Sequence, residues 1–161
     1  MQQSRITTIA FMLLMALPGL SLAKPGGLPS KQLIAGQFQR WNAALKTGNP
    51  ETVAALYCEP GGVLLPTVSN KVRTSHAEIL DYFEHFLELK PVGKIDKAYI
   101  RILGPDTAVN SGIYTFRLTK NGKPEDVQAR YTFVYQKQNG KWCIMDHHSS
   151  AMPEVAPALS H

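Results

Sequence analysis

The sequence predicts an α+β fold in which N-terminal helices lie inside a cone-shaped, curved antiparallel sheet. Apolar residues recur at helical spacing in the first half of the chain. Long alternating runs joined by Asn-Gly pairs fill the second half. Helices followed by such a meander describe an α+β domain, and strands of this length twist and curl. We therefore expect the first helix to lie in the concavity, with a pocket where helix and sheet diverge.

The first residues have the pattern of a secretory signal peptide. Arg5 precedes an uncharged apolar run over residues 6–17, and Ser21-Leu22-Ala23 supplies the small residues that a signal peptidase reads. The run is shorter than the roughly 20 apolar residues of a membrane span. We expect residues 1–23 to be cleaved, which leaves an exported chain, periplasmic or secreted, without stable insertion in a membrane.

Three helices are expected after a flexible lead-in over residues 24–29. Ser30 and Asn49 are N-caps, and Ser75 with Glu78 forms a capping box. The expected helices cover residues 30–47, 49–57 and 75–89. Their inward stripes are Leu33, Ile34, Phe38, Trp41 and Leu45 in the first helix, and Ile79, Leu80, Phe83, Phe86 and Leu87 in the third.

Strands dominate the rest of the chain. Asn121-Gly122 and Asn139-Gly140 lie between alternating runs and predict two hairpin turns. The expected strands cover residues 63–65, 95–103, 108–119, 127–138 and 141–149. We assign residues 30–152 to one domain, which is long enough to bury its own core, and residues 153–161 to a loose tail.

Charge and cysteine content limit the possible partners. Loss of Arg5 with the signal peptide leaves 16 basic residues against 12 acidic ones. The lysines are scattered, so we expect no nucleic-acid binding, which needs a clustered basic surface. Cys58 and Cys143 are too few for an ordinary zinc site. They form a disulfide after export or remain two buried thiols.

Several segments carry a family resemblance. They are Tyr57-Cys58-Glu59-Pro60-Gly61, Asp81-Tyr82-Phe83-Glu84, Tyr114-Thr115-Phe116-Arg117-Leu118-Thr119 and Gly140-Lys141-Trp142 with His148, Ser150 and Pro153. With these residues the chain resembles the nuclear transport factor 2-like superfamily. More narrowly, it is similar to the association (hub) domain of calcium/calmodulin-dependent protein kinase II, its bacterial single-domain relatives and polyketide cyclase-like proteins. The resemblance implies a homo-oligomer, a dimer or larger. Kinase motifs are absent from the sequence.

The resemblance also implies a pocket with basic and histidine side chains that hold a small anionic or carboxylate ligand. Arg117 is the matching position, and Ile79, Phe133 and Ser149 stand where the hub has other pocket charges. Arg130, Arg73 and Tyr114 are further candidates for ligand binding, because a pocket arginine pairs with an anion. The alternative is that these arginines lie on the outer face or pair with Asp or Glu.

Asp146 and His148 are the candidate catalytic residues. Two residues apart on a strand, they share one face, whereas His147 points to the other. An Asp and a His on one face form a general acid/base pair, or the histidine is a structural group in the sheet or at a subunit contact. The sequence holds no metal-binding or dinucleotide motif, so no metal or cofactor is expected.

Two functions follow from these observations. The first is an exported, self-associating, ligand-binding domain with outer-face apolar strand residues as its assembly surface. The second is a cofactor-free isomerase, dehydratase or hydrolase, or an oxidoreductase as some relatives are labelled, that uses the pocket with Asp146 and His148.

Overall fold

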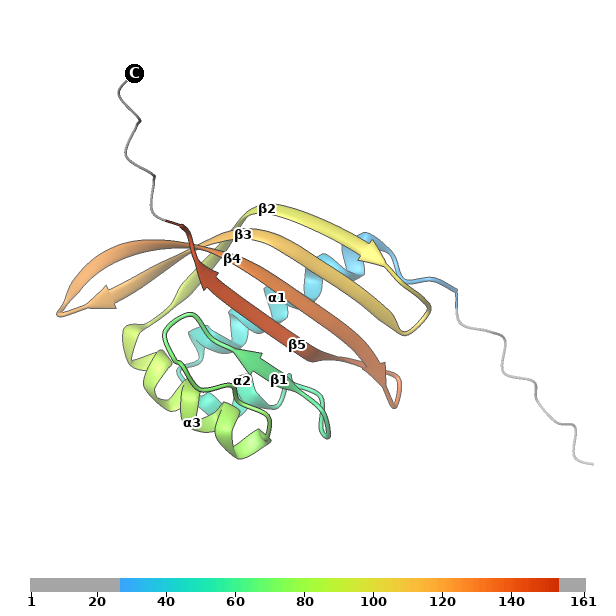
Figure 1. Ribbon diagram of the computed structural model, residues 1–161, viewed down its shortest axis with the longest axis horizontal. Coiled ribbons are helices and arrows are strands. Elements are labelled where there is room, and N and C mark those ends of the chain that lie inside the picture. The colour runs from blue at the N-terminus through green and yellow to red at the C-terminus, as the bar shows by residue number, and fades with distance from the viewer. Residues whose placement is uncertain (1–26, 154–161) are drawn as a thin grey trace, which may run out of the picture.

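The computed structural model describes residues 27–153, so the expected signal peptide and nearly all of the expected tail lie outside the described residues. Figure 1 shows the order of elements along the chain. They are α1 (Lys31–Lys46), α2 (Pro50–Ala54), β1 (Val63–Leu65), α3 (His76–Phe86), a 3-10 turn (Leu87–Leu89), β2 (Val92–Ile102), β3 (Thr107–Lys120), β4 (Lys123–Gln138) and β5 (Lys141–Ala151). The α+β fold class predicted from the sequence is confirmed.

The helix starts follow the predicted caps. The Ser30 hydroxyl accepts a hydrogen bond from the Leu33 amide at 3.1 Å, and the Asn49 side chain accepts one from the Glu51 amide at 3.0 Å. The second helix is shorter than expected and ends at Ala54. Strand β2 begins directly after Pro91, earlier than the predicted start at residue 95.

The five strands form one open, mixed sheet in the order β1-β5-β4-β3-β2. Strands β2 to β5 pair antiparallel, as the Asn-Gly turns predict, with φ of 50° at both Asn121 and Asn139. Strand β1 is different, because it pairs parallel to β5, with Leu64 opposite His147. The antiparallel pairing predicted for the four long strands is observed, and the short edge strand β1, whose pairing the sequence does not predict, makes the sheet mixed.

All three helices lie on one side of the sheet (Figure 1). The core between helices and sheet contains Ile34, Phe38, Trp41 and Leu45 of α1 and Ile79 and Phe83 of α3. Leu33, which the sequence placed in the inward stripe, is 45% exposed. Within residues 27–153, no helix has the length and apolar character needed to cross a membrane.

In addition to the apolar core, a buried side-chain contact and a disulfide join the helical half to the sheet. The buried Asn42 amide of α1 both donates to the Gly93 carbonyl and accepts from the Gly93 amide, each at 2.8 Å. A Cβ at Gly93 would lie 2.9 Å from the Phe116 ring, so this close approach requires glycine. Cys58, after α2, is bonded to Cys143 of β5 in a disulfide that spans 85 positions of sequence.

Candidate ligand-binding site

A cavity of about 60 Å³ lies between the inner face of the sheet, α3 and the segment that follows β1. Its walls are mostly apolar and include Trp41, Leu64, Phe83, Phe86 and Leu118. Val68, which is 68% exposed, stands at its outer rim. A space of this size holds a few water molecules or a small organic ligand. The cavity lies where the sequence predicts a pocket, between helix and sheet.

His147 is a buried histidine in the wall of this cavity. Its Nδ1 atom shares a hydrogen bond of 2.9 Å with the Tyr57 hydroxyl, and its Nε2 atom has no partner among the described residues. The ring stacks on Phe133 at 4.0 Å between centroids and receives the edge of Trp41 at 5.2 Å. Burial lowers the pKa of His147 to about 3, because the charged imidazolium loses its hydration. The imidazole is therefore neutral near pH 7.

A β-bulge in β5 turns His147 toward the cavity. Ile144 pairs with Tyr135 and Asp146 pairs with Val134, which leaves Met145 as an extra residue. Both Ile144 and His147 are consequently buried, although they are three residues apart. Strict alternation from Ile144 would place Asp146 and His148 inside instead.

Asp146 and His148 lie together on the outer face of the sheet, opposite Val134 and Thr132 of β4. His148 is exposed and Asp146 is half-buried. Partial burial raises the pKa of Asp146, an effect that nearby His148 opposes. Neither residue lines the cavity, so the geometry does not favour the enzyme hypothesis that places this pair in the pocket. Their acid/base role stays a prediction.

Three hydroxyl groups form a second polar feature of the cavity. The Tyr114 hydroxyl donates to the Ser149 oxygen at 2.5 Å, and the Ser149 and Thr67 oxygens are also 2.5 Å apart. Burial raises the pKa of the Tyr114 phenol, so it stays protonated and able to donate. Tyr114, a candidate ligand-binding residue from the sequence, thus lies in the cavity wall, and its binding role stays a prediction.

The predicted ligand-binding arginines of the strands do not reach the cavity. Arg117 is 68% exposed and forms a two-pronged ion pair with Asp126, at 2.9 and 3.1 Å. Arg130 is exposed and donates to the Ala151 carbonyl at 3.3 Å. Tyr114 and Phe116 occupy the inner face of β3, so alternation sends Arg117 outward. Of the two placements that the sequence left open for these arginines, both therefore take the outer face rather than the pocket.

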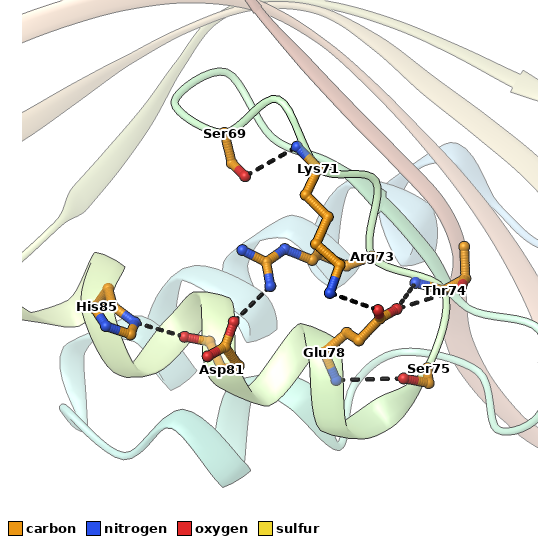
Figure 2. Close-up of polar contacts among 8 residues, drawn as sticks. All are labelled: Ser69, Lys71, Arg73, Thr74, Ser75, Glu78, Asp81 and His85. Atoms are coloured by element: carbon orange, nitrogen blue, oxygen red, sulfur yellow. Dashed lines mark hydrogen bonds and ion pairs between the residues drawn. The ribbon is translucent and has the colours of Figure 1, made fainter.

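Arg73 lies at the edge of the site rather than inside it. Its guanidinium pairs with Asp81 of α3 (Figure 2). Its backbone exchanges two hydrogen bonds of 2.9 Å with Leu64 of β1. The side chain is 13% exposed. With Tyr82 and Phe86 it lines an open surface groove beside the cavity. Its charge is therefore already matched by a carboxylate of the chain itself.

The segment between β1 and α3 forms a lid over the cavity, which we define as residues 66–74. Thr67 and Val68, near its start, line the cavity. Its last residues are tied to α3. The Glu78 carboxylate binds the Lys71 ammonium at 2.8 Å and accepts from the Thr74 amide at 3.0 Å (Figure 2). These contacts, with the Lys71 hydrogen bond as the largest cause, lower the pKa of Glu78 to about 2.

Sequence reasoning missed His147, its partner Tyr57, and Thr67 as parts of the site. His147 was set on the other face from Asp146 and His148, but which face is inner depends on the bulge at Met145. Ser149, where the resemblance implies a charge in the hub, does line the cavity, whereas Ile79 and Phe133 are core residues. Among residues 27–153, no cluster of three His, Cys, Asp or Glu side chains is placed to hold a metal.

The comparisons with known proteins agree with this geometry. The model of the family described as "Calcium/calmodulin dependent protein kinase II association domain" matches residues 30–153. A solved structure from Xanthomonas campestris, assigned as such an association domain, is 56% identical, with a TM-score of 0.75 over 85% of this chain and 100% of that one. No curated protein matches the sequence.

Two more distant structures share the fold. The kinase II hub homology domain of Chlamydamonas reinhardtii is 22% identical, with a TM-score of 0.60 over 74% of this chain and 96% of that one. A nuclear transport factor 2-like superfamily protein of Salmonella enterica is 19% identical, with a TM-score of 0.68 over 81% and 96%. From the family match across the whole domain and the Xanthomonas identity, this chain belongs to the calcium/calmodulin dependent protein kinase II association domain family.

Proposed function

We propose that this chain is an exported, self-associating domain that binds a small molecule in its cavity and has no kinase activity of its own. The observation that carries self-association is the outer face of β2 to β5, which no helix of residues 27–153 covers (Figure 1). Membership of a family described by its association domain supports the same proposal.

The composition of this outer face suits a subunit contact. Its centre holds aliphatic and small polar side chains in cross-strand pairs, and its β2 edge carries the charges of Lys94, Lys97 and Arg101. The central pairs are Val109 with Val134 and Ser111 with Thr132, and next to them Ile113 pairs with Arg130, the one charged side chain among these three pairs. Protein interfaces have few charges at their core and a polar rim. A two-fold dimer that packs this face against its copy buries the same patch of both subunits.

Light scattering of the purified mature chain tests self-association. The wild type is expected to be a dimer or larger. Ile113→Lys places a charge at the centre of the outer face and is expected to give a folded monomer. Leu33→Lys is the matched control, because Leu33 is an exposed leucine on α1, away from this face. A strictly monomeric wild type, or an Ile113→Lys variant with the wild-type mass, contradicts the proposal.

Export is supported by the pattern of residues 1–23 and by the disulfide between Cys58 and Cys143. Disulfides of this structural kind persist in oxidising compartments. The N-terminal residue and the free-thiol content of the purified chain test the export proposal. The chain from the cell envelope or medium is expected to begin at Lys24 and to carry no free thiol. A full-length or reduced chain in the cytosol would overturn the export proposal.

Small-molecule binding is supported by the cavity itself. The cavity has apolar walls and a small number of polar groups, namely His147, Ser149, Thr67 and Tyr114, which is the usual composition of a ligand pocket. Asp146 and His148 lie on the other face of the sheet. Ligand binding in the cavity is therefore better supported than catalysis by Asp146 and His148.

A further inference from the structure

The walls of the cavity carry no formal charge among the described residues. Arg117 and Arg130 point away from it, and Arg73 is paired with Asp81 outside it. His147 is neutral near pH 7. An ionised carboxylate inside this cavity would therefore lose its hydration without gaining a cationic partner. The free-energy cost of that desolvation is far larger than the free energy gained by burying the apolar part of the ligand. The cavity is unsuited to the small anion that the family resemblance implies.

Two polar atoms of residues in the cavity wall, Nε1 of Trp41 and Nε2 of His147, have no hydrogen-bond partner among the described residues. His147 is only 3% exposed, and its Nε2 has no hydrogen-bond partner among the described residues. The hydroxyls of Tyr114, Ser149 and Thr67, in contrast, bond to one another. Buried polar atoms of native proteins are nearly always satisfied, so an unpartnered one beside a cavity indicates a missing partner there.

We propose that the cavity binds a small neutral molecule with a short aliphatic body and one hydroxyl or carbonyl oxygen, held by a hydrogen bond between that oxygen and Nε2 of His147. The inference rests on the proposal that the cavity is a ligand site, and it names the ligand class. The neutral imidazole offers one hydrogen bond at Nε2, as donor or acceptor according to its tautomer. A hydroxyl meets either case, and a carbonyl meets the first.

The size of the cavity limits the aliphatic body. An engineered cavity of about 150 Å³ takes benzene, and this one has about 60 Å³. The enclosed part of the ligand is therefore roughly two to three non-hydrogen atoms, by proportion to the six carbons of benzene in that cavity. A larger ligand would extend past Val68 at the rim, where the lid meets solvent.

An NMR titration of the mature protein with 1-propanol and with propionate tests the proposal near neutral pH. The two probes have the same three-carbon skeleton and differ in charge. We expect saturable binding of 1-propanol and a change in the ¹⁵N shift of His147 Nε2, with propionate at least about tenfold weaker. The substitution His147→Phe should weaken the binding of 1-propanol by about two- to tenfold, which corresponds to the loss of one hydrogen bond. His76→Phe, at a half-buried histidine of α3 that does not line the cavity, is the matched control and should bind as the wild type does.

The outcomes separate the two proposals. Propionate that binds as tightly as 1-propanol overturns the neutral ligand class but leaves the cavity as a ligand site. Binding of 1-propanol without a shift at His147 Nε2 overturns the anchoring role, and this measurement on the wild type holds even if His147→Phe does not fold. Failure of both probes to bind at the highest concentrations that the fold tolerates overturns ligand binding itself.

Discussion

His147 shows at the scale of one residue how a titratable group is kept uncharged. The aromatic rings of Phe133 and Trp41 surround its imidazole, and the single polar contact is to the Tyr57 hydroxyl. No carboxylate among the described residues contacts it to stabilise a proton. The folded protein therefore resists protonation of this side chain down to a pH of about 3.

This lowered pKa predicts a loss of stability in mild acid. An unfolded chain binds a proton on histidine below pH of about 6.5, whereas the folded chain does so only near pH 3. The contribution of His147 is therefore complete above about pH 6.5 and is lost as pH falls toward 3. The free energy of unfolding should decrease by up to about 1.4 kcal/mol per pH unit in that window.

Urea unfolding at pH steps between about 7 and 4 measures this slope. His147→Phe removes the titrating group, so its slope over this range should be clearly flatter than that of the wild type. Equal slopes for the wild type and His147→Phe would show that another group dominates acid unfolding.

At the scale of elements, α3 and the lid form one unit that covers the cavity. Ser75 caps the helix, but Glu78 does not bond back to the Ser75 amide as in a standard capping box. It bonds instead to Thr74 and Lys71 of the lid (Figure 2). The first turn of α3 thus determines the position of the segment that closes the ligand site.

Glu78→Gln is expected to loosen the lid. The substitution removes the charge that binds Lys71 and weakens the acceptor for the Thr74 amide. Amide hydrogen exchange of residues 66–74 should become about two- to fivefold faster, as befits an exposed ion pair, and high salt should produce part of the same effect in the wild type. Glu84→Gln on the exposed side of the same helix is the control. Equal exchange in both variants would contradict this role of Glu78.

At the scale of the whole molecule, the disulfide joins the helical half to the sheet. Cys58 follows α2 and Cys143 lies in β5, with 85 positions of sequence between them. The Cys58 amide also donates to the Ile144 carbonyl at 2.9 Å, so the covalent bond reinforces a contact that the backbone already makes. The closed loop includes the lid, α3 and most of the sheet.

The double variant Cys58→Ala, Cys143→Ala should be less stable than the oxidised wild type by about 2–5 kcal/mol, because a long closed loop restricts the unfolded chain. Denaturant unfolding measures the difference, and a reductant provides the internal control. Reductant should lower the stability of the wild type toward that of the variant and leave the stability of the variant unchanged. A wild type as stable with reductant as without it would show that the disulfide contributes little to the fold.

Local sequence signals determined most of the architecture of this protein. Caps at Ser30, Asn49 and Ser75 begin the helices, and positive φ at Asn121 and Asn139 makes the hairpins. These features depend on hydrogen bonds and backbone sterics within a few residues, so they can be predicted from short stretches of chain.

The tertiary structure alone decided which residues face the cavity. The inserted residue Met145 depends on how β5 pairs with β4, and it sends His147 inward and His148 outward. Strand β1 pairs parallel to β5, which is far away in the sequence. Glu78 of α3 contacts the lid, which belongs to no helix or strand. Local sequence signals predict neither contact. A strand pattern has period two on either face, so alternation in the sequence groups residues by face without stating which face is buried.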